Sequence, residues 1–173
     1  MQGTIIKTED PLVSSYSRRE RIQVIVFIDT SALIKRYARE KGSETIDDLF
    51  QKEKDLWISQ LSIVELLSAL HRKARDKELL SEDVSLARAA CFRDVRRNRM
   101  RIVAFDRRIF KDTLKLFLKD QLFLHLRTLD AFQVSFADKL NRDKGLDMFV
   151  VSDRKFKETV ASIRNYPVLD PED

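Results

Sequence analysis

The chain has 173 residues, enough for one domain with a hydrophobic core, and 43% of them are hydrophobic. This composition excludes a disordered protein, and no apolar run approaches the roughly 18–20 residues of a membrane-spanning helix. One cysteine, Cys91, excludes a disulfide framework and a cysteine-rich zinc site. The net charge of +5 is a modest indication of a polyanionic partner.

Residues 1–21 are predicted to form an N-terminal arm of unknown role, ahead of a single domain at 22–173. The first twenty residues lack the central apolar block of a signal peptide. We therefore expect a cytoplasmic protein without a membrane partner.

Beyond the arm, apolar segments rich in β-branched residues alternate with segments of helical periodicity. Strands are predicted at 24–28, 56–59, 101–105 and 148–151, with a possible fifth at 166–169. Helices are predicted at 31–40, 43–53, 62–76, 82–98, 108–120, 128–141 and 154–164. This alternation predicts an α/β fold with a parallel sheet covered on both faces, whose ligands bind at the carboxyl ends of the strands.

Acidic residues follow several predicted strands or lie early in the helices that come next. Asp29, Asp106 and Asp153 come directly after the first, third and fourth strands or one residue later. Glu65 and Asp130 lie near the starts of helices. Several carboxylates are therefore expected to meet at one edge of the sheet, although Asp106 is interpreted as a simple cap or turn residue.

The other four acids also have simpler interpretations. Asp29 and Asp153 are good helix N-caps, where a carboxylate also meets the positive end of the helix dipole. Ser62 and Glu65 have the spacing of a capping box, in which Glu65 reaches back to the backbone of Ser62. Asp130 is harder to explain in this way, because its helical face is mostly apolar and a buried carboxylate needs a partner.

Taken together, these carboxylates favour a metal site. Two carboxylates about 4 Å apart repel by roughly 4 kcal/mol at an effective dielectric of 20, so a shared cleft needs a cation. Ligands that are all oxygen atoms indicate Mg²⁺ or Mn²⁺ rather than zinc. His71 is expected at the surface and His125 in the core, and they are not spaced as a metal pair. Hydrolysis is therefore expected to use water activated by a metal rather than a histidine base.

A metal cleft with basic surroundings is typical of a site that cleaves phosphodiesters. A run of basic residues is also typical of a solvated helix face, and both interpretations of the basic residues stay open. The candidates for binding a nucleic-acid backbone are Arg96, Arg97, Arg99, Arg107 and Arg108.

Four segments together resemble a known family. FIDTSALIKRY (27–37), WISQLSIVELLSAL (57–70), LRTLDAFQVSFA (126–137) and FVVSDRKF (149–156) resemble, in this order, the motif blocks of PIN-domain ribonucleases. The match is closest to the VapC-type toxins of toxin–antitoxin pairs. It covers about residues 24–170, which is nearly everything except the arm.

The resemblance implies a three-layer α/β/α sandwich around a parallel sheet of roughly five strands. It implies an endoribonuclease that cuts RNA with Mg²⁺ or Mn²⁺ held by an acidic quartet. Proteins of this type usually form homodimers and are inhibited by a small antitoxin that inserts a basic residue into the acidic pocket. By motif position, the catalytic and metal-binding quartet is Asp29, Glu65, Asp130 and Asp153. Ser31, and less securely Thr128 and Ser152, match hydroxyl positions near the metal.

Two features depart from the family pattern, and two other functions stay open. The spacing from Glu65 to Asp130 is long for a compact toxin, and the arm has no counterpart. A phosphatase of the haloacid dehalogenase kind also has an Asp after its first strand, but its second Asp is replaced here by Ser31. A non-catalytic module that binds RNA or protein is the other alternative.

Overall fold

The computed structural model describes residues 23–52, 54–118 and 126–173, and the arm at 1–21 lies outside them. Five parallel strands form one sheet in the order β3-β2-β1-β4-β5. Their bounds are β1 Ile25–Ile28, β2 Asp55–Ser59, β3 Arg101–Val103, β4 Met148–Val150 and β5 Val168–Leu169. All five predicted strands are confirmed, although β3 and β5 are shorter than predicted. The central strand β1 pairs with β2 on one side and with β4 on the other.

The predicted helices are also present in the described residues. Their bounds are α1 Thr30–Leu33, η1 (a 3-10 helix) Ile34–Arg36, α2 Ser43–Gln51, α3 Gln60–Arg75, α4 Ser81–Arg96, α5 Arg107–Leu118, α6 Thr128–Lys144 and α7 Arg154–Ile163. One prediction is wrong in detail, because the single helix expected at 31–40 is a short α-helix followed by the 3-10 helix. None of the helices described here has the length and apolar character needed to cross a membrane.

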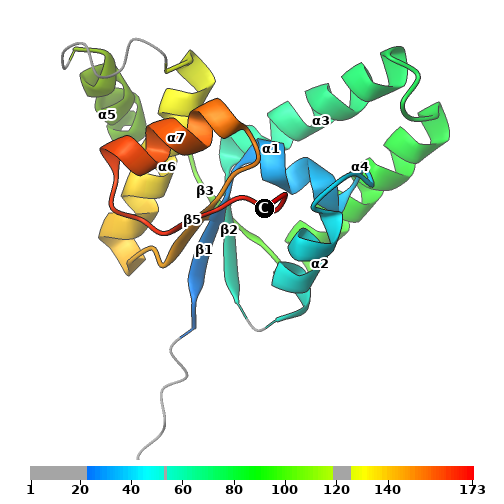
Figure 1. Ribbon diagram of the computed structural model, residues 1–173, viewed down its shortest axis with the longest axis horizontal. Coiled ribbons are helices and arrows are strands. Elements are labelled where there is room, and N and C mark those ends of the chain that lie inside the picture. The colour runs from blue at the N-terminus through cyan, green and yellow to red at the C-terminus, as the bar shows by residue number, and fades with distance from the viewer. Residues whose placement is uncertain (1–22, 53, 119–125) are drawn as a thin grey trace, which may run out of the picture.

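The helices cover both faces of the sheet, which confirms the three-layer sandwich. Alternate residues of β1 point to opposite faces, so Val26 and Ile28 pack in one core and Phe27 packs in the other. The first core is completed by α1 to α4 and the second by α5 to α7. Figure 1 shows these two groups of helices on opposite sides of the strands.

The C-terminal residues are held against the segment that follows β1. Lys35 is only 4% exposed, and its Nζ forms ion pairs with Glu40 at 3.0 Å and Glu172 at 2.6 Å. Gly42 has a φ of 85°, and a Cβ atom there would lie 2.8 Å from the carbonyl oxygen of Pro171. Glycine at this position therefore permits the close approach between Pro171 and the start of α2.

Candidate active site

The four acids of the predicted quartet line one cavity of about 800 Å³. Asp29 follows β1 and Asp153 follows β4, and these two strands are neighbours in the sheet. Glu65 lies in α3, which follows β2 on the other side of β1. Asp130 comes from the first turn of α6. The prediction that these four side chains approach one edge of the sheet therefore agrees with the fold.

Asp106 does not line this cavity. Its Oδ1 accepts a hydrogen bond from the backbone N–H of Ile109 at 2.9 Å, and its Oδ2 lies 3.3 Å from the Nζ of Lys139. The interpretation of Asp106 as a cap residue is confirmed. His71 is exposed, as expected, and His125 lies outside the described residues.

Asp29 caps α1 and is nevertheless an unusual carboxylate. Its Oδ2 accepts hydrogen bonds from the backbone N–H of Ser31 at 2.8 Å and from the Ser31 hydroxyl at 2.6 Å. The side chain is 5% exposed. Burial raises its pKa to about 6, against the two Ser31 hydrogen bonds, and the negative charge of Glu65 adds to the rise. No cation is among the groups that shift the pKa of Asp29, so none of them compensates the negative charge of its carboxylate.

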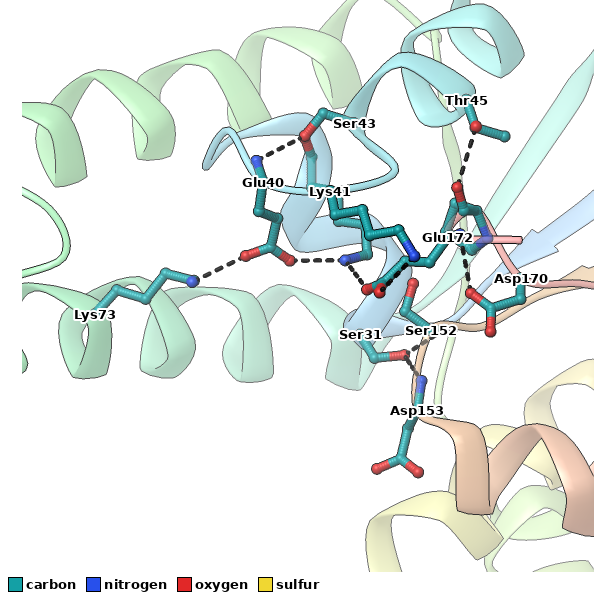
Figure 2. A network of polar contacts seen from close by, with 12 residues as sticks. Ser31, Glu40, Lys41, Ser43, Thr45, Lys73, Ser152, Asp153, Asp170 and Glu172 are labelled. Atoms are coloured by element: carbon teal, nitrogen blue, oxygen red, sulfur yellow. Dashed lines mark hydrogen bonds and ion pairs between the residues drawn. The ribbon is translucent and has the colours of Figure 1, made fainter.

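Ser31 joins the ends of the two central strands. While its hydroxyl donates to Asp29, the same oxygen accepts from the backbone N–H groups of Ser152 at 3.0 Å and Asp153 at 3.2 Å. Figure 2 shows the Ser31 side chain directed at this backbone. Ser31 thus fixes the distance between the segments that carry Asp29 and Asp153, which suits its predicted place beside a metal.

Asp153 and Asp130 lie on the α6 and α7 side of the cavity. Asp153 caps α7 through the backbone N–H of Phe156 at 3.0 Å, and its Oδ2 lies 3.7 Å from Nη1 of Arg127. Burial raises the pKa of Asp130; the positive charge of Arg127 opposes this rise, and the negative charges of Asp153 and Glu65 add to it. Asp130 is therefore close enough to Asp153 and Glu65 for their charges to shift its pKa.

Glu65 does not form the predicted capping box. The helix α3 begins at Gln60, two residues earlier than predicted, and its N-cap is Ser59 rather than Ser62. The Ser59 hydroxyl accepts from the backbone N–H of Ser62 at 2.9 Å. Glu65 is instead held from outside its own helix. Its Oε2 accepts from the Thr30 hydroxyl at 2.8 Å and from Nε2 of Gln133 at 2.5 Å.

The sequence analysis missed Thr30 and Gln133, although each carried a signal. Gln133 stands one turn after Asp130, between the apolar residues Phe132 and Val134 of α6, and a buried amide there needs a polar partner. Thr30 lies between Asp29 and Ser31, two predicted site residues. Their common partner Glu65 is distant in the sequence, so the pattern of residues could not predict their hydrogen bonds to it.

The predicted hydroxyl residues differ in their surroundings. Thr128 is exposed and lines the cavity, whereas Ser152 does not line it. The Ser152 hydroxyl oxygen is buried and has no hydrogen-bond partner among the described residues. The assignment of both residues to the surroundings of a metal stays a prediction.

The candidate nucleic-acid-binding arginines do not line the cavity. Three of them, Arg96, Arg97 and Arg99, precede β3 and therefore stand at the amino ends of the strands, away from the acids. Arg107 and Arg108 begin α5 beyond the carboxyl end of β3, on the same edge of the sheet as the acids. The cavity is lined by other cations, which are Arg72, Lys73 and Arg127.

The donor chemistry of the cavity fits a divalent cation. Within residues 23–52, 54–118 and 126–173, no three His, Cys, Asp or Glu side chains are close enough to hold a metal ion. The four acids of the quartet are nevertheless coupled through their charges, as the pKa values of Asp29 and Asp130 indicate. All their donor atoms are carboxylate oxygens, which Mg²⁺ and Mn²⁺ prefer. Binding would require the four side chains to move closer together.

The family model of the PIN domain matches residues 26–161. The chain belongs to the PIN domain family. No curated protein is similar enough in sequence to count as a relative. Solved structures with the same fold include VapBC2 from Rickettsia felis bound to a DNA fragment from its promoter, with 14% identity and a TM-score of 0.57 over 85% of this chain and 98% of that one.

Two further structures share this PIN-domain fold. A toxin–antitoxin complex from Klebsiella pneumoniae matches with 15% identity and a TM-score of 0.52, over 84% of this chain and 97% of that one. VapC20 from Mycobacterium tuberculosis, a sarcin–ricin loop cleaving toxin, matches with 17% identity and a TM-score of 0.57, over 77% of this chain and 93% of that one. At these identities the likeness establishes the fold.

Proposed function

We propose that this PIN-domain protein is a divalent-metal-dependent endoribonuclease and the toxin of a toxin–antitoxin pair. The observation that carries the proposal is the meeting of four carboxylates from separate elements in one cavity. The negative charge of Glu65 raises the pKa of both Asp29 and Asp130, so these carboxylates oppose one another in the absence of a cation. Helix capping accounts for the positions of Asp29 and Asp153. Asp130 accepts a hydrogen bond from the backbone N–H of Arg127 at the start of α6, whereas Glu65 caps no helix backbone and needs another reason to be there.

The proposed ligands of Mg²⁺ or Mn²⁺ are Asp29, Glu65 and Asp130, with Asp153 as an outer ligand. When bound, the cation would neutralise the phosphate and make water more acidic. The protein's own part is to hold the carboxylates. Ser31 fixes Oδ2 of Asp29, and Thr30 fixes Oε2 of Glu65.

The shape of the cavity supports a chain-like polyanionic substrate. It follows one face of α3, lined by Leu61, Val64, Glu65, Ser68, Ala69 and Arg72, which have the i, i+3, i+4, i+7 pattern of a single helix face. At 1.5 Å per residue, Arg72 stands about 10 Å along the helix from Glu65. Arg127 lies on the other side of the acids, near Asp153. Cations on both sides of the carboxylates suit phosphates that flank the cleaved bond.

The toxin assignment is supported by the descriptions of the similar structures, two of which are toxin–antitoxin complexes or pairs. A cavity with several acids would accept a basic side chain from a small antitoxin. We expect a homodimer that elutes at twice the mass of one chain. Co-expression with the product of a small neighbouring reading frame should abolish cleavage if that product is the antitoxin.

The experiment that tests the proposal is the incubation of purified protein with total RNA, followed by mapping of the cleavage sites. We expect discrete cuts with Mg²⁺ or Mn²⁺, none with EDTA, and none with the Asp29→Asn variant. Asn caps a helix about as well as Asp, so this variant should fold normally.

Metal-independent cleavage, or full activity of Asp29→Asn, would contradict the proposal. RNA binding by the wild-type protein without cleavage in either metal would favour the non-catalytic module instead. An aspartyl phosphate trapped on Asp29 would favour the phosphatase.

A further inference from the structure

Gln133 is a buried amide in the interior of α6. Its side chain is only 1% exposed, and its neighbours on the helix, Val134 and Ala137, are fully buried and apolar. A long polar side chain in such surroundings loses its hydration and has to be compensated by protein contacts.

The side-chain hydrogen bonds of Gln133 all involve its Nε2 atom, and their partners lie in α1 and α3. Nε2 lies 2.5 Å from Oε2 of Glu65, 3.2 Å from the Thr30 hydroxyl and 3.2 Å from the Ser62 hydroxyl. Thr30 in turn donates to the same Oε2 of Glu65 at 2.8 Å. Two donors from α6 and α1 therefore meet on one oxygen of Glu65 in α3.

The orientation of the amide follows from these partners. With the opposite orientation, the carbonyl oxygen of Gln133 would face the carboxylate of Glu65, and two acceptors would repel. In the observed orientation the carbonyl oxygen Oε1 is buried without a hydrogen-bond partner among the described residues. Gln133 thus leaves one of its own polar atoms unsatisfied while its amino group serves Glu65.

We propose that Gln133 is a positioning residue, which fixes Oε2 of Glu65 so that Oε1 remains the oxygen available to a divalent cation. This inference rests on the proposed function. Gln133 stands one turn after Asp130 on the same helix, so it ties the segments of three of the four proposed ligands together. Loss of a partner that orients a metal-binding side chain typically weakens metal affinity by roughly 10-fold to 100-fold.

A purely structural role fits less well. An apolar side chain of similar size would fill the same space in α6 without burying an unsatisfied carbonyl oxygen. If Gln133 served only the fold, its replacement by Met should be neutral or destabilising and should leave metal binding alone. If it serves Glu65, the same replacement should weaken metal binding while the fold persists.

The experiment is a calorimetric titration of the full-length chain with Mn²⁺, comparing the wild type with Gln133→Met. We expect the affinity to fall about 10-fold to 100-fold, as for other partners of metal ligands. The matched control is Thr113→Val. It removes a buried hydrogen bond of 2.8 Å from Thr113 in α5 to Ser135, which lies in α6 as Gln133 does. That control should lower the melting temperature and keep the wild-type Mn²⁺ affinity.

A double-mutant cycle makes the assignment specific to Glu65. In the Glu65→Gln background, Gln133→Met should weaken Mn²⁺ binding by no more than about twofold further, because its target is already gone. Equal losses in both backgrounds would overturn the proposal, since Gln133 would then act on something other than Glu65.

Other outcomes separate this inference from the proposed function. Wild-type protein that binds Mn²⁺, together with Gln133→Met that binds it equally well, overturns the inference alone. Wild-type protein that binds no Mn²⁺ overturns the proposed function and the inference with it. Gln133→Asn, whose amide is one methylene too short to reach Glu65, repeats the test if the Met variant does not fold. Unfolding of both variants would make Gln133 a structural residue and contradict the proposal.

Discussion

Two buried charge clusters follow strand β1, and they are built in opposite ways. Around Lys35, opposite charges are matched: although burial opposes its charge, hydrogen bonds to Glu172 and Glu40 raise the pKa of Lys35. Around Asp29, the neighbouring charge has the same sign, and burial together with the charge of Glu65 raises the pKa of Asp29 to about 6. Lys35 and Asp29 are similarly buried, at 4% and 5% exposure.

The difference indicates which cluster serves the fold. The pairs of Lys35 join η1 to the C-terminal residues, and Glu40 is shared with Lys73 of α3 at 2.9 Å, as Figure 2 shows. The acids around Asp29 bring α1, α3, α6 and α7 together less favourably, because like charges repel in a region of low dielectric. A protein retains such a cluster when a ligand compensates it.

The largest expected effect concerns Glu65. Glu65→Gln keeps an acceptor for the Thr30 hydroxyl but removes a charge that a cation requires. We expect cleavage of RNA to fall by about a thousandfold or more, because a metal contributes several kcal/mol to transition-state stabilisation. The melting temperature without metal should stay within a few degrees of the wild type. Cleavage assays and thermal melts of the same preparation check both parts, and full activity would reduce Glu65 to a structural residue.

The paired cluster should respond in the opposite way. Lys35→Ala leaves Glu40 and Glu172 without their buried partner, and we expect unfolding in urea to show a loss of about 3 kcal/mol in stability. Lys41→Ala is the matched control, because Lys41 is 74% exposed and lies 4.0 Å from the same Glu172. The control should change stability by less than about 0.5 kcal/mol. Equal effects of the two substitutions would show that the Lys35 cluster is not structural.

The pH dependence of stability distinguishes the clusters as well. Folding raises the pKa of Asp29 from its ordinary 3.8 to about 6, so the folded protein binds this proton more tightly than the unfolded chain does. The contribution of Asp29 to stability is therefore fully present below pH 3.8 and is lost as the pH rises through about 6.

From pH 5 to pH 7.5 this loss amounts to roughly 1 kcal/mol for the metal-free protein. Asp29→Asn does not titrate, so its stability relative to the wild type should rise by this amount over the same interval. Urea unfolding with EDTA at both pH values measures the difference, and a constant difference would contradict the raised pKa.

The smallest expected effect concerns an exposed cation at the cavity. Arg72→Ala should leave stability unchanged, unlike Lys35→Ala, and should raise KM for RNA by about threefold to fivefold with little change in kcat. The slope of log KM against log salt should become shallower by about one charge. Arg97→Ala, at the amino ends of the strands, is the control. A larger effect of Arg97 would place RNA on the opposite edge of the sheet.

The sequence was sufficient for the sheet and for the approach of the four acids, because strand ends in a parallel sheet meet at one edge. It was misleading at Ser62 and Glu65, since Ser59 and Ser62 are both good cap residues and only the folded chain decides where α3 begins. Gln133 could not be linked to Glu65, because the contact joins residues 68 positions apart. Arg72 and Arg127 are only seven and three positions from Glu65 and Asp130, so helical spacing alone could have placed them beside the acids.

The central claim is that the like-charged cluster exists to bind a divalent cation, and thermal unfolding of the wild type with and without Mn²⁺ tests it most directly. At a concentration a hundredfold above its Kd, Mn²⁺ should raise the melting temperature by about 5–10 °C, whereas Asp29→Asn should show almost no shift. A wild-type melting temperature that does not respond to Mn²⁺ or Mg²⁺ would contradict the claim.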